Sequence, residues 1–242
     1  MNHSIEIDFS AGPGIKLYVF FGGIAAGIAM PPFEFYKASK IVADNKIFVR
    51  DFSQTWYHSG IPPHSKTLAG AAAQLTRLIQ SIAPSQVYLV GNSMGGFAAI
   101  LFSRLLRCGD VIAFSPQTFI SPSLRRKHGD TRWAKEIRTT HFRSMLKPRA
   151  WDLKKTLQDS DYHAKISIYF SQASKLDTIH AGHLKDLNYV HLHPLGEGGH
   201  QVVKYLRDRG QLSAIMSGGD ATPNKPAICR HSSLAAEQTR SA

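Results

Sequence analysis

The chain has 242 residues, of which 43% are hydrophobic and 19% are charged, a composition ordinary for a folded domain with a sizeable core. No uninterrupted apolar stretch reaches the about 18 residues that a membrane-spanning helix needs, so we expect no transmembrane segment. Residues 1–9 contain no Lys or Arg ahead of the first long apolar run, unlike a secretory signal, and we therefore expect a cytoplasmic protein. The two cysteines, Cys108 and Cys229, are too few for a disulfide scaffold and are expected to be free thiols.

The net charge of +12 is concentrated in one part of the chain. Residues 123–156 contain eleven Lys and Arg side chains but only three acidic ones. Such a surface attracts an acidic substrate, an anionic lipid or nucleic acid, or serves only to keep the protein in solution. Because no recognised nucleic-acid-binding motif accompanies the charge, we expect no nucleic-acid partner.

Short apolar runs alternate with helical segments along the chain. Residues 5–9 alternate apolar and polar side chains and precede a turn rich in glycine, which indicates an edge hairpin. β-Branched and aromatic runs predict further strands at 16–21, 46–50, 86–90, 110–114, 165–170 and 190–195. Helical spacing predicts helices at 33–43, 65–83, 95–106 and from 201 onward, the second with Ser65 as its N-cap. This alternation predicts an α/β fold whose mostly parallel sheet is covered by helices on both faces.

The sequence Gly91-Asn-Ser-Met-Gly-Gly fits the pattern G-x-S-x-G and lies between a predicted strand and a predicted helix. A tight turn here exposes the hydroxyl of Ser93, and side chains at Gly91 or Gly95 would collide across it. The helix that follows directs free N–H groups at the turn, so the amide of Met94 can stabilise an oxyanion. A chance glycine-rich turn is the alternative, but the flanking strand and helix favour a nucleophile at Ser93.

The segment YLVGNSMGGFAA (residues 88–99) resembles the nucleophile turn of the α/β-hydrolases, particularly the small single-domain serine esterases. In order and spacing the resemblance covers about residues 16–212. It implies the α/β-hydrolase fold, with a serine, an acid and a histidine following one another after successive strands. It also implies a second oxyanion donor after an early strand, for which we predict the backbone N–H of Gly23. The His-Gly pair that many members have there is replaced by Phe21-Gly22-Gly23.

A histidine beyond the last predicted strand must take the serine proton, because serine is a poor nucleophile at its own pKa. His200 follows a glycine-rich loop after the strand at 190–195 and precedes a predicted helix. The competing histidines lie inside that strand (His191, His193) or on another predicted helix (His180, His183). His200 is therefore the predicted base.

Asp177 is the predicted acid that orients the histidine ring. It follows the strand at 165–170 after a short loop, where the resemblance places the acid. An aspartate just before a helical stretch also suits a helix N-cap, and the two roles do not exclude each other. Asp51, Asp186 and Glu197 are the alternatives.

The predicted substrate pocket is lined by Ile24, Trp56 and Tyr57, although Trp56 and Tyr57 could equally pack over the sheet edge. Residues of about 117–160 lie between two predicted strands, where α/β-hydrolases often insert a lid. We expect a lid-like, basic helical insertion there, with a charged, solvated face as the alternative. One domain is expected over 1–215, followed by a disordered tail over 216–242, which has few large apolar residues.

These residues predict a serine hydrolase that cleaves a small carboxylic ester or thioester through Ser93, His200, Asp177 and an acyl-enzyme intermediate. The basic segment points to an anionic substrate. An acyltransferase using the same three residues, or a non-catalytic binding protein with this fold, are the alternatives. No Cys/His cluster has metal-ligand spacing and no phosphate-binding loop motif is present, so we expect neither a metal nor a cofactor. The sequence does not predict the oligomeric state.

Overall fold

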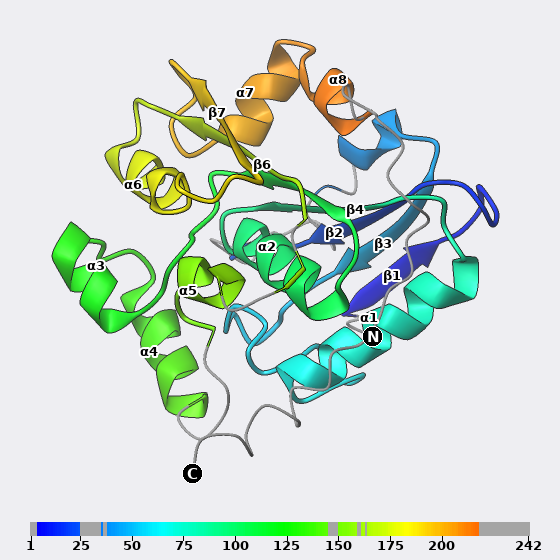
Figure 1. Ribbon diagram of the computed structural model, residues 1–242, viewed down its shortest axis with the longest axis horizontal. Coiled ribbons are helices and arrows are strands. Elements are labelled where there is room, and N and C mark those ends of the chain that lie inside the picture. Colours follow the sequence, from blue (N-terminus) through cyan, green and yellow to red (C-terminus); the bar gives the residue numbers. More distant parts are fainter. Residues whose placement is uncertain are drawn as a thin grey trace.

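The computed structural model describes residues 4–24, 35, 38–144, 150–158, 161–162 and 164–217. In this part of the chain one sheet lies between two groups of helices (Figure 1). Its strands are β1 (Ile5–Asp8), β2 (Leu17–Phe21), β3 (Asn45–Val49), β4 (Val87–Asn92), β5 (Asp110–Phe114), β6 (Ile166–Ser171) and β7 (Val190–Leu195). They lie in the order β1-β3-β2-β4-β5-β6-β7. Only β1 is antiparallel to its neighbour, so the prediction of a mostly parallel sheet is confirmed.

The central strands are buried on both faces, which explains their nearly continuous apolar sequences. A strand sends alternate side chains to opposite faces of the sheet. Along β2, Leu17, Val19 and Phe21 therefore enter one apolar cluster, whereas Tyr18 and Phe20 enter the other. Each face of the sheet needs a covering layer of helices.

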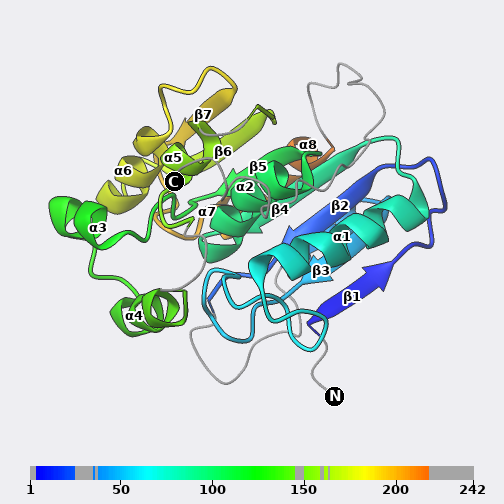
Figure 2. The same cartoon turned by 60° about the horizontal axis from the view of Figure 1, so that its bottom comes forward.

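The helices supply these two layers. They are η1 (Ala38–Ile41, a 3-10 helix), α1 (Leu68–Ile82), α2 (Met94–Leu106), α3 (Pro122–His128), α4 (Ala134–Arg143), α5 (Leu153–Gln158), α6 (Lys175–His183), α7 (Val202–Asp208) and α8 (Leu212–Met216). Buried side chains of α1, α2, α5 and α6 join the cluster of Val19, and those of α7 and α8 join the cluster of Phe20. Helices α3 and α4 lie on the side of the molecule away from β1 (Figures 1 and 2). None of the described helices has the length and apolar character to cross a membrane.

The predicted edge hairpin is wrong, because β1 pairs with β3 and not with β2. Both edges of β2 are already occupied, by β3 on one side and β4 on the other, so β1 cannot pair with β2 and lies instead at the edge of the sheet beyond β3. The predicted N-cap of α1 is wrong by two residues. Thr67 caps the helix by accepting a hydrogen bond from the Gly70 N–H at 3.0 Å, whereas Ser65 accepts one from the Thr67 N–H at 3.1 Å.

Helix α8 continues one residue past the predicted domain boundary at residue 215. Met216 is buried, and its carbonyl oxygen accepts a hydrogen bond from the Tyr18 hydroxyl at 2.6 Å. Residues 218–242 of the predicted tail lie outside the described residues.

Cys108 is disulfide-bonded, so the expectation of a free thiol there is wrong. The other cysteine of the sequence, Cys229, lies outside the described residues.

Candidate active site

Ser93 occupies the turn between β4 and α2 in a backbone conformation that is costly for a side-chain-bearing residue, with φ 54° and ψ −115°. A Cβ atom at Gly91 would collide with the backbone of Gly95, and one at Gly95 would collide with the carbonyl oxygen of Phe21. Both atoms would lie much closer than the 3.0 Å that real Cβ atoms keep. The glycines of the motif are therefore required by the tightness of the turn, as the sequence predicts.

Hydrogen bonds to the neighbouring strand hold this strained turn in place. The Ser93 N–H donates to the Phe114 carbonyl at the end of β5, at 2.9 Å. The Ser93 carbonyl accepts from the N–H of Phe97 at 3.0 Å and from the N–H of Gln117 at 3.3 Å. The serine is thus fixed to β5, to α2 and to the loop after β5.

His200 lies on the loop between β7 and α7. The two residues before it, Gly198 and Gly199, have φ of 99° and 52°, conformations that glycine adopts without strain. The Nε2 atom of His200 lies 3.1 Å from the Oγ atom of Ser93, within hydrogen-bond distance. The side chain of His200 is 41% exposed, so the ring reaches solvent on one side.

Asp177 is the third residue of α6, and its side chain is only 1% exposed. Its two carboxylate oxygens lie 3.0 and 2.9 Å from Nδ1 of His200. Burial alone would raise the pKa of Asp177, but the hydrogen bond from His200 and the charges of His200 and Arg132 outweigh burial and lower it. Because an ionised carboxylate only accepts hydrogen bonds, Nδ1 carries the proton and a neutral ring leaves Nε2 free to accept one from Ser93.

Asp177 is not the N-cap of its helix. Ser174 has that position, and its Oγ accepts a hydrogen bond from the Asp177 N–H at 3.4 Å. The three alternative acids have other partners. Asp51 accepts hydrogen bonds from three backbone N–H groups of its own loop, Asp186 pairs with Lys154, and Glu197 pairs with Arg209.

The predicted oxyanion donors flank the same turn. Met94 is the first residue of α2, and the first N–H groups of a helix have no acceptor within the helix. Gly23 follows β2, the strand that pairs with β4 on the side away from β5. The close approach of Gly95 to the carbonyl of Phe21 places the start of α2 directly against this end of β2.

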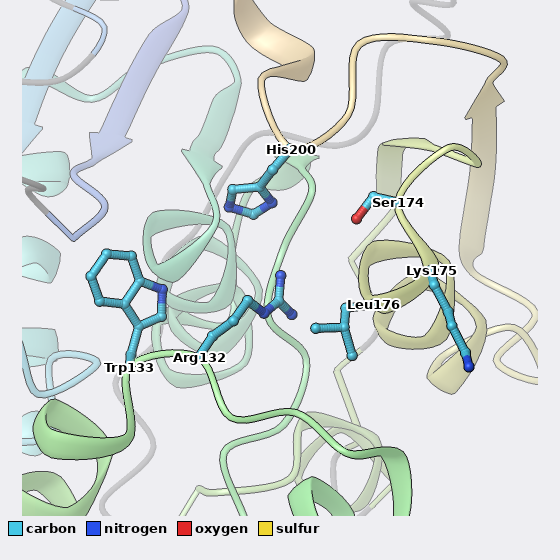
Figure 3. Close-up of a pocket in the computed structure, with 6 residues that line it drawn as sticks. All are labelled: Arg132, Trp133, Ser174, Lys175, Leu176 and His200. Atoms are coloured by element: carbon cyan, nitrogen blue, oxygen red, sulfur yellow. The ribbon is translucent and has the colours of Figure 1, made fainter.

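An open cavity of about 570 Å³ adjoins His200. It is lined by Arg132, Trp133, Ser174, Lys175, Leu176 and His200. Figure 3 shows the Arg132 side chain extending toward the His200 ring, with Trp133 on one side and Leu176 on the other, while the Lys175 side chain points away. The cavity combines an aromatic and an aliphatic wall with polar groups beside the imidazole, a lining suited to a small organic ligand.

The predicted pocket residues do not line this cavity. Trp56 and Tyr57 are both 0% exposed and belong to the apolar core, and Ile24 is partly buried against the same core. The Trp56 indole N–H donates to the Gln117 side chain at 3.1 Å, and the Tyr57 hydroxyl lies 3.0 Å from the Gly22 carbonyl oxygen. Trp56 and Tyr57 therefore pack beneath the loops that carry Ser93 and Gly23, and their contact with a substrate stays a prediction.

Like Ser174, Lys175 and Leu176 in the cavity wall, Arg132 is a residue of this site that the sequence did not predict. Its Nη1 atom donates to Oδ1 of Asp177 at 3.0 Å, and its Nε atom donates to Oδ1 of Asp130 at 3.1 Å. Arg132 lies in a segment with eleven basic residues, and its residue type does not distinguish it from the others. The short acidic–basic spacing of Asp130 and Arg132 is the one signal that could have drawn attention to it.

No known protein-family model matches the sequence, and no curated protein matches it either. Solved structures do match. A capsule O-acetyltransferase of Neisseria meningitidis serogroup A has a TM-score of 0.64 at 14% identity, over 88% of this chain and 90% of that one. An α/β hydrolase from a Medee basin deep-sea metagenome library has a TM-score of 0.58 at 15% identity, over 91% and 95%. A fluorophosphonate-binding serine hydrolase of Staphylococcus aureus has a TM-score of 0.53 at 12% identity, over 84% of each chain.

At such low identity these matches establish the architecture and not the reaction. The architecture of this chain is a mostly parallel sheet with helices on both faces (Figure 1). The chain has the α/β-hydrolase fold.

Proposed function

We propose that this protein is a serine hydrolase that cleaves a carboxylic ester or thioester through an acyl-enzyme intermediate. The observation that carries the proposal is the line of contacts from Ser93 Oγ to His200 Nε2, at 3.1 Å, and from His200 Nδ1 to Asp177, at 2.9 Å. A nucleophile bonded to a base, and the base to an orienting acid, is the arrangement that activates a serine hydroxyl. Ser93 lies in the turn before α2, Asp177 in the first turn of α6 and His200 in the loop before α7. His200 is 23 positions from Asp177 and 107 from Ser93, so local sequence alone does not bring them together.

In the first step, the Ser93 oxygen attacks the carbonyl carbon of the substrate while Nε2 of His200 takes the hydroxyl proton. The carbonyl π electrons move to its oxygen, and the resulting imidazolium is stabilised by Asp177. When the tetrahedral intermediate collapses, the bond to the leaving oxygen or sulfur breaks and His200 gives that atom the proton. Water then attacks the acyl-serine with the same proton transfers, and the carboxylic acid leaves.

The backbone N–H groups of Gly23 and Met94 are the proposed donors to the oxyanion. Support comes from the position of Met94 at the start of α2, where the helix dipole also favours negative charge. Losing one such donor typically costs on the order of 10²–10³ in turnover. Both donors are main-chain groups, so the missing His-Gly pair near residue 21 does not prevent the reaction.

The cavity beside His200 is the proposed substrate site. Trp133 and Leu176 offer an apolar wall to an acyl or alcohol group, and the basic segment between β5 and β6 favours an anionic substrate. Trp133 and Arg132 of this segment already reach the cavity, which supports a lid-like role for residues 117–160. A panel that pairs neutral esters with carboxylate-bearing analogues tests this specificity, because only the latter should lose kcat/KM as ionic strength rises.

Acyl transfer to an alcohol or amine is the second candidate. The cavity of about 570 Å³ is open, so a second substrate could approach the acyl-serine beside His200. One of the structural neighbours is a capsule O-acetyltransferase, and another structure of that enzyme was solved with CoA. The products distinguish the two reactions: transfer predicts an acylated acceptor at the expense of free acid when an alcohol is added.

The proposal is tested by replacing two histidines of the same region. His200→Ala should abolish hydrolysis of a short p-nitrophenyl ester, because among the described residues only Nε2 of His200 lies in place to take the serine proton. His191→Ala, which changes an exposed ring on β7, should keep the wild-type rate. Undiminished turnover in His200→Ala would contradict the mechanism. If the wild-type protein neither hydrolyses esters nor reacts with a fluorophosphonate, the non-catalytic alternative is favoured.

A further inference from the structure

Helix α6 presents two buried side chains to the segment that precedes α4. Asp177 and His180 lie three residues apart and therefore on one face of the helix, and their side chains are 1% and 0% exposed. Asp177 accepts a hydrogen bond from Arg132 at 3.0 Å, and His180 Nε2 lies 3.0 Å from Oδ2 of Asp130. The facing segment thus supplies one hydrogen-bond partner to each of these side chains, Arg132 to Asp177 and Asp130 to His180.

The two partners also bind each other. The Nε and Nη2 atoms of Arg132 donate to the two oxygens of Asp130, at 3.1 and 3.2 Å, in a bidentate pairing. Asp130 in addition accepts a hydrogen bond from the Arg132 backbone N–H at 3.0 Å. A closed ring of contacts results, from Asp177 through Arg132 and Asp130 to His180 and back along α6.

The proton positions in this ring follow from a backbone contact. Nδ1 of His180 accepts a hydrogen bond from the Thr118 N–H at 3.0 Å, so the proton of the neutral ring is on Nε2 and is donated to Asp130. Burial lowers the pKa of His180 and outweighs the bond to Asp130, which keeps the ring neutral. Arg132 is therefore the cation that lies between the two buried carboxylates of Asp130 and Asp177.

Such an arrangement is expensive to bury, and apolar side chains of the same volume would pack the site at less cost. The contacts of Arg132 show what this buried charge does for the site. The oxygen of Asp177 that receives the Arg132 hydrogen bond also lies 3.0 Å from Nδ1 of His200. The guanidinium thus fixes the carboxylate in the orientation that faces the base, and its charge favours the ionised form.

We propose that Arg132, held by Asp130, which His180 holds in turn, is a positioning residue that keeps the carboxylate of Asp177 aimed at His200. The inference rests on the proposed function. It makes the acid of the site dependent on the segment between β5 and β6, because that segment supplies Arg132. The same segment supplies Trp133 to the cavity, so the docking that orients Asp177 also forms one wall of the substrate site.

The charged and titratable groups around Asp177 in the described chain set the direction of the pH effect. They are His200 from the loop after β7, Arg132 from the facing segment with Asp130 behind it, and His180 from α6 itself. Removing the guanidinium takes away a hydrogen bond and a positive charge that lower the pKa of Asp177, so the pKa of that carboxyl rises. A higher pH is then needed before the acid of the site is ionised.

The test compares pH profiles of kcat/KM for ester hydrolysis in four proteins. Relative to wild type, Arg132→Met should move the acidic limb to higher pH and lower kcat by on the order of 10- to 100-fold. Arg132→Lys keeps the charge and should restore the position of the limb while recovering only part of kcat. Arg77→Met removes an exposed cation of α1, outside the segment that supplies Arg132, and should match wild type.

An acidic limb that stays at the wild-type pH in folded Arg132→Met would overturn the inference, whatever happens to kcat. If Arg132→Met does not fold, Asp130→Asn takes its place in the test, because it weakens the hold on Arg132 without removing the guanidinium. An acidic limb of kcat/KM that moves to higher pH in Asp130→Asn supports the positioning role of Arg132, and an acidic limb at the wild-type pH refutes it. Failure of the proposed function looks different. In that case wild type itself would neither hydrolyse the esters nor react with a fluorophosphonate at Ser93.

Discussion

Both carboxylate oxygens of Asp177 face Nδ1 of His200, at 3.0 and 2.9 Å, from a side chain that is almost fully buried. An amide in this place presents an NH₂ group as well as an oxygen, and it can hold the ring in the wrong tautomer. Asp177→Asn should therefore lower kcat by about 10⁴-fold with little change in KM. Asp186→Asn is the matched control.

The control removes a carboxylate that pairs with Lys154 at 2.7 Å and is 60% exposed. It should leave both kinetic constants at wild-type values. Steady-state kinetics on one chromogenic ester give kcat and KM for both variants, Asp177→Asn and Asp186→Asn. Equal losses in the two variants, or none in Asp177→Asn, would show that Asp177 does not orient the base.

Two glycines in helices should respond to alanine with opposite signs. A Cβ at Gly95 would collide with the Phe21 carbonyl, so Gly95→Ala should lower the free energy of unfolding by about 3 kcal/mol or more. A Cβ at Gly182 in α6 meets nothing within 4 Å, so Gly182→Ala should raise stability by about 0.5–1 kcal/mol. Urea unfolding followed by circular dichroism measures both, and a stable Gly95→Ala protein would contradict the tight turn at Ser93.

The buried ring of His58 should make the free energy of unfolding fall in mild acid. Its ring is 6% exposed, and burial lowers its pKa from 6.5 to about 4 although Nδ1 lies 2.9 Å from the Thr55 carbonyl oxygen. The unfolded chain therefore binds a proton between pH 6.5 and 4 that the folded chain does not. This difference contributes about 3 kcal/mol of stability above pH 6.5, which is lost as the pH falls through this window.

Replacing His58 by Phe removes the titration while keeping a buried ring. The variant lacks the hydrogen bond to Thr55 and should therefore be less stable than wild type at pH 7. Between pH 6.5 and 4, however, its free energy of unfolding should fall less steeply than that of wild type. Urea unfolding at half-unit pH steps gives both slopes. Parallel curves for wild type and His58→Phe would mean that this ring does not carry the acid sensitivity.

Most strands and the Ser93 turn could be predicted from the sequence because their signals are local. An apolar run with glycines at fixed offsets specifies a strand, a turn and a helix without knowledge of the rest of the fold. His200 could be selected from twelve histidines because a glycine loop after the last strand is also a local feature. The predicted bounds of β5 and β7 agree with the structure to the residue.

Features that depend on competition between distant segments were not predictable. The partner of β1 depends on which strands occupy the edges of β2, and that is decided by the whole sheet order. The contact between Arg132 and Asp177 spans 45 positions, and ten other basic side chains of the segment fit the sequence equally well. Trp56 and Tyr57 were placed in a pocket because aromatic residues line many pockets, but aromatic residues also fill cores, and the sequence does not separate the two.

The central claim is that the hydroxyl of Ser93 is the nucleophile. Incubation with a fluorophosphonate, followed by mass spectrometry of the intact protein and of its peptides, tests this directly because the reagent bonds covalently to an activated serine. The account predicts a single adduct on the peptide containing Ser93, slowed strongly in His200→Ala and absent in Ser93→Ala. An adduct on a different serine, or equal labelling of wild type and Ser93→Ala, would contradict it.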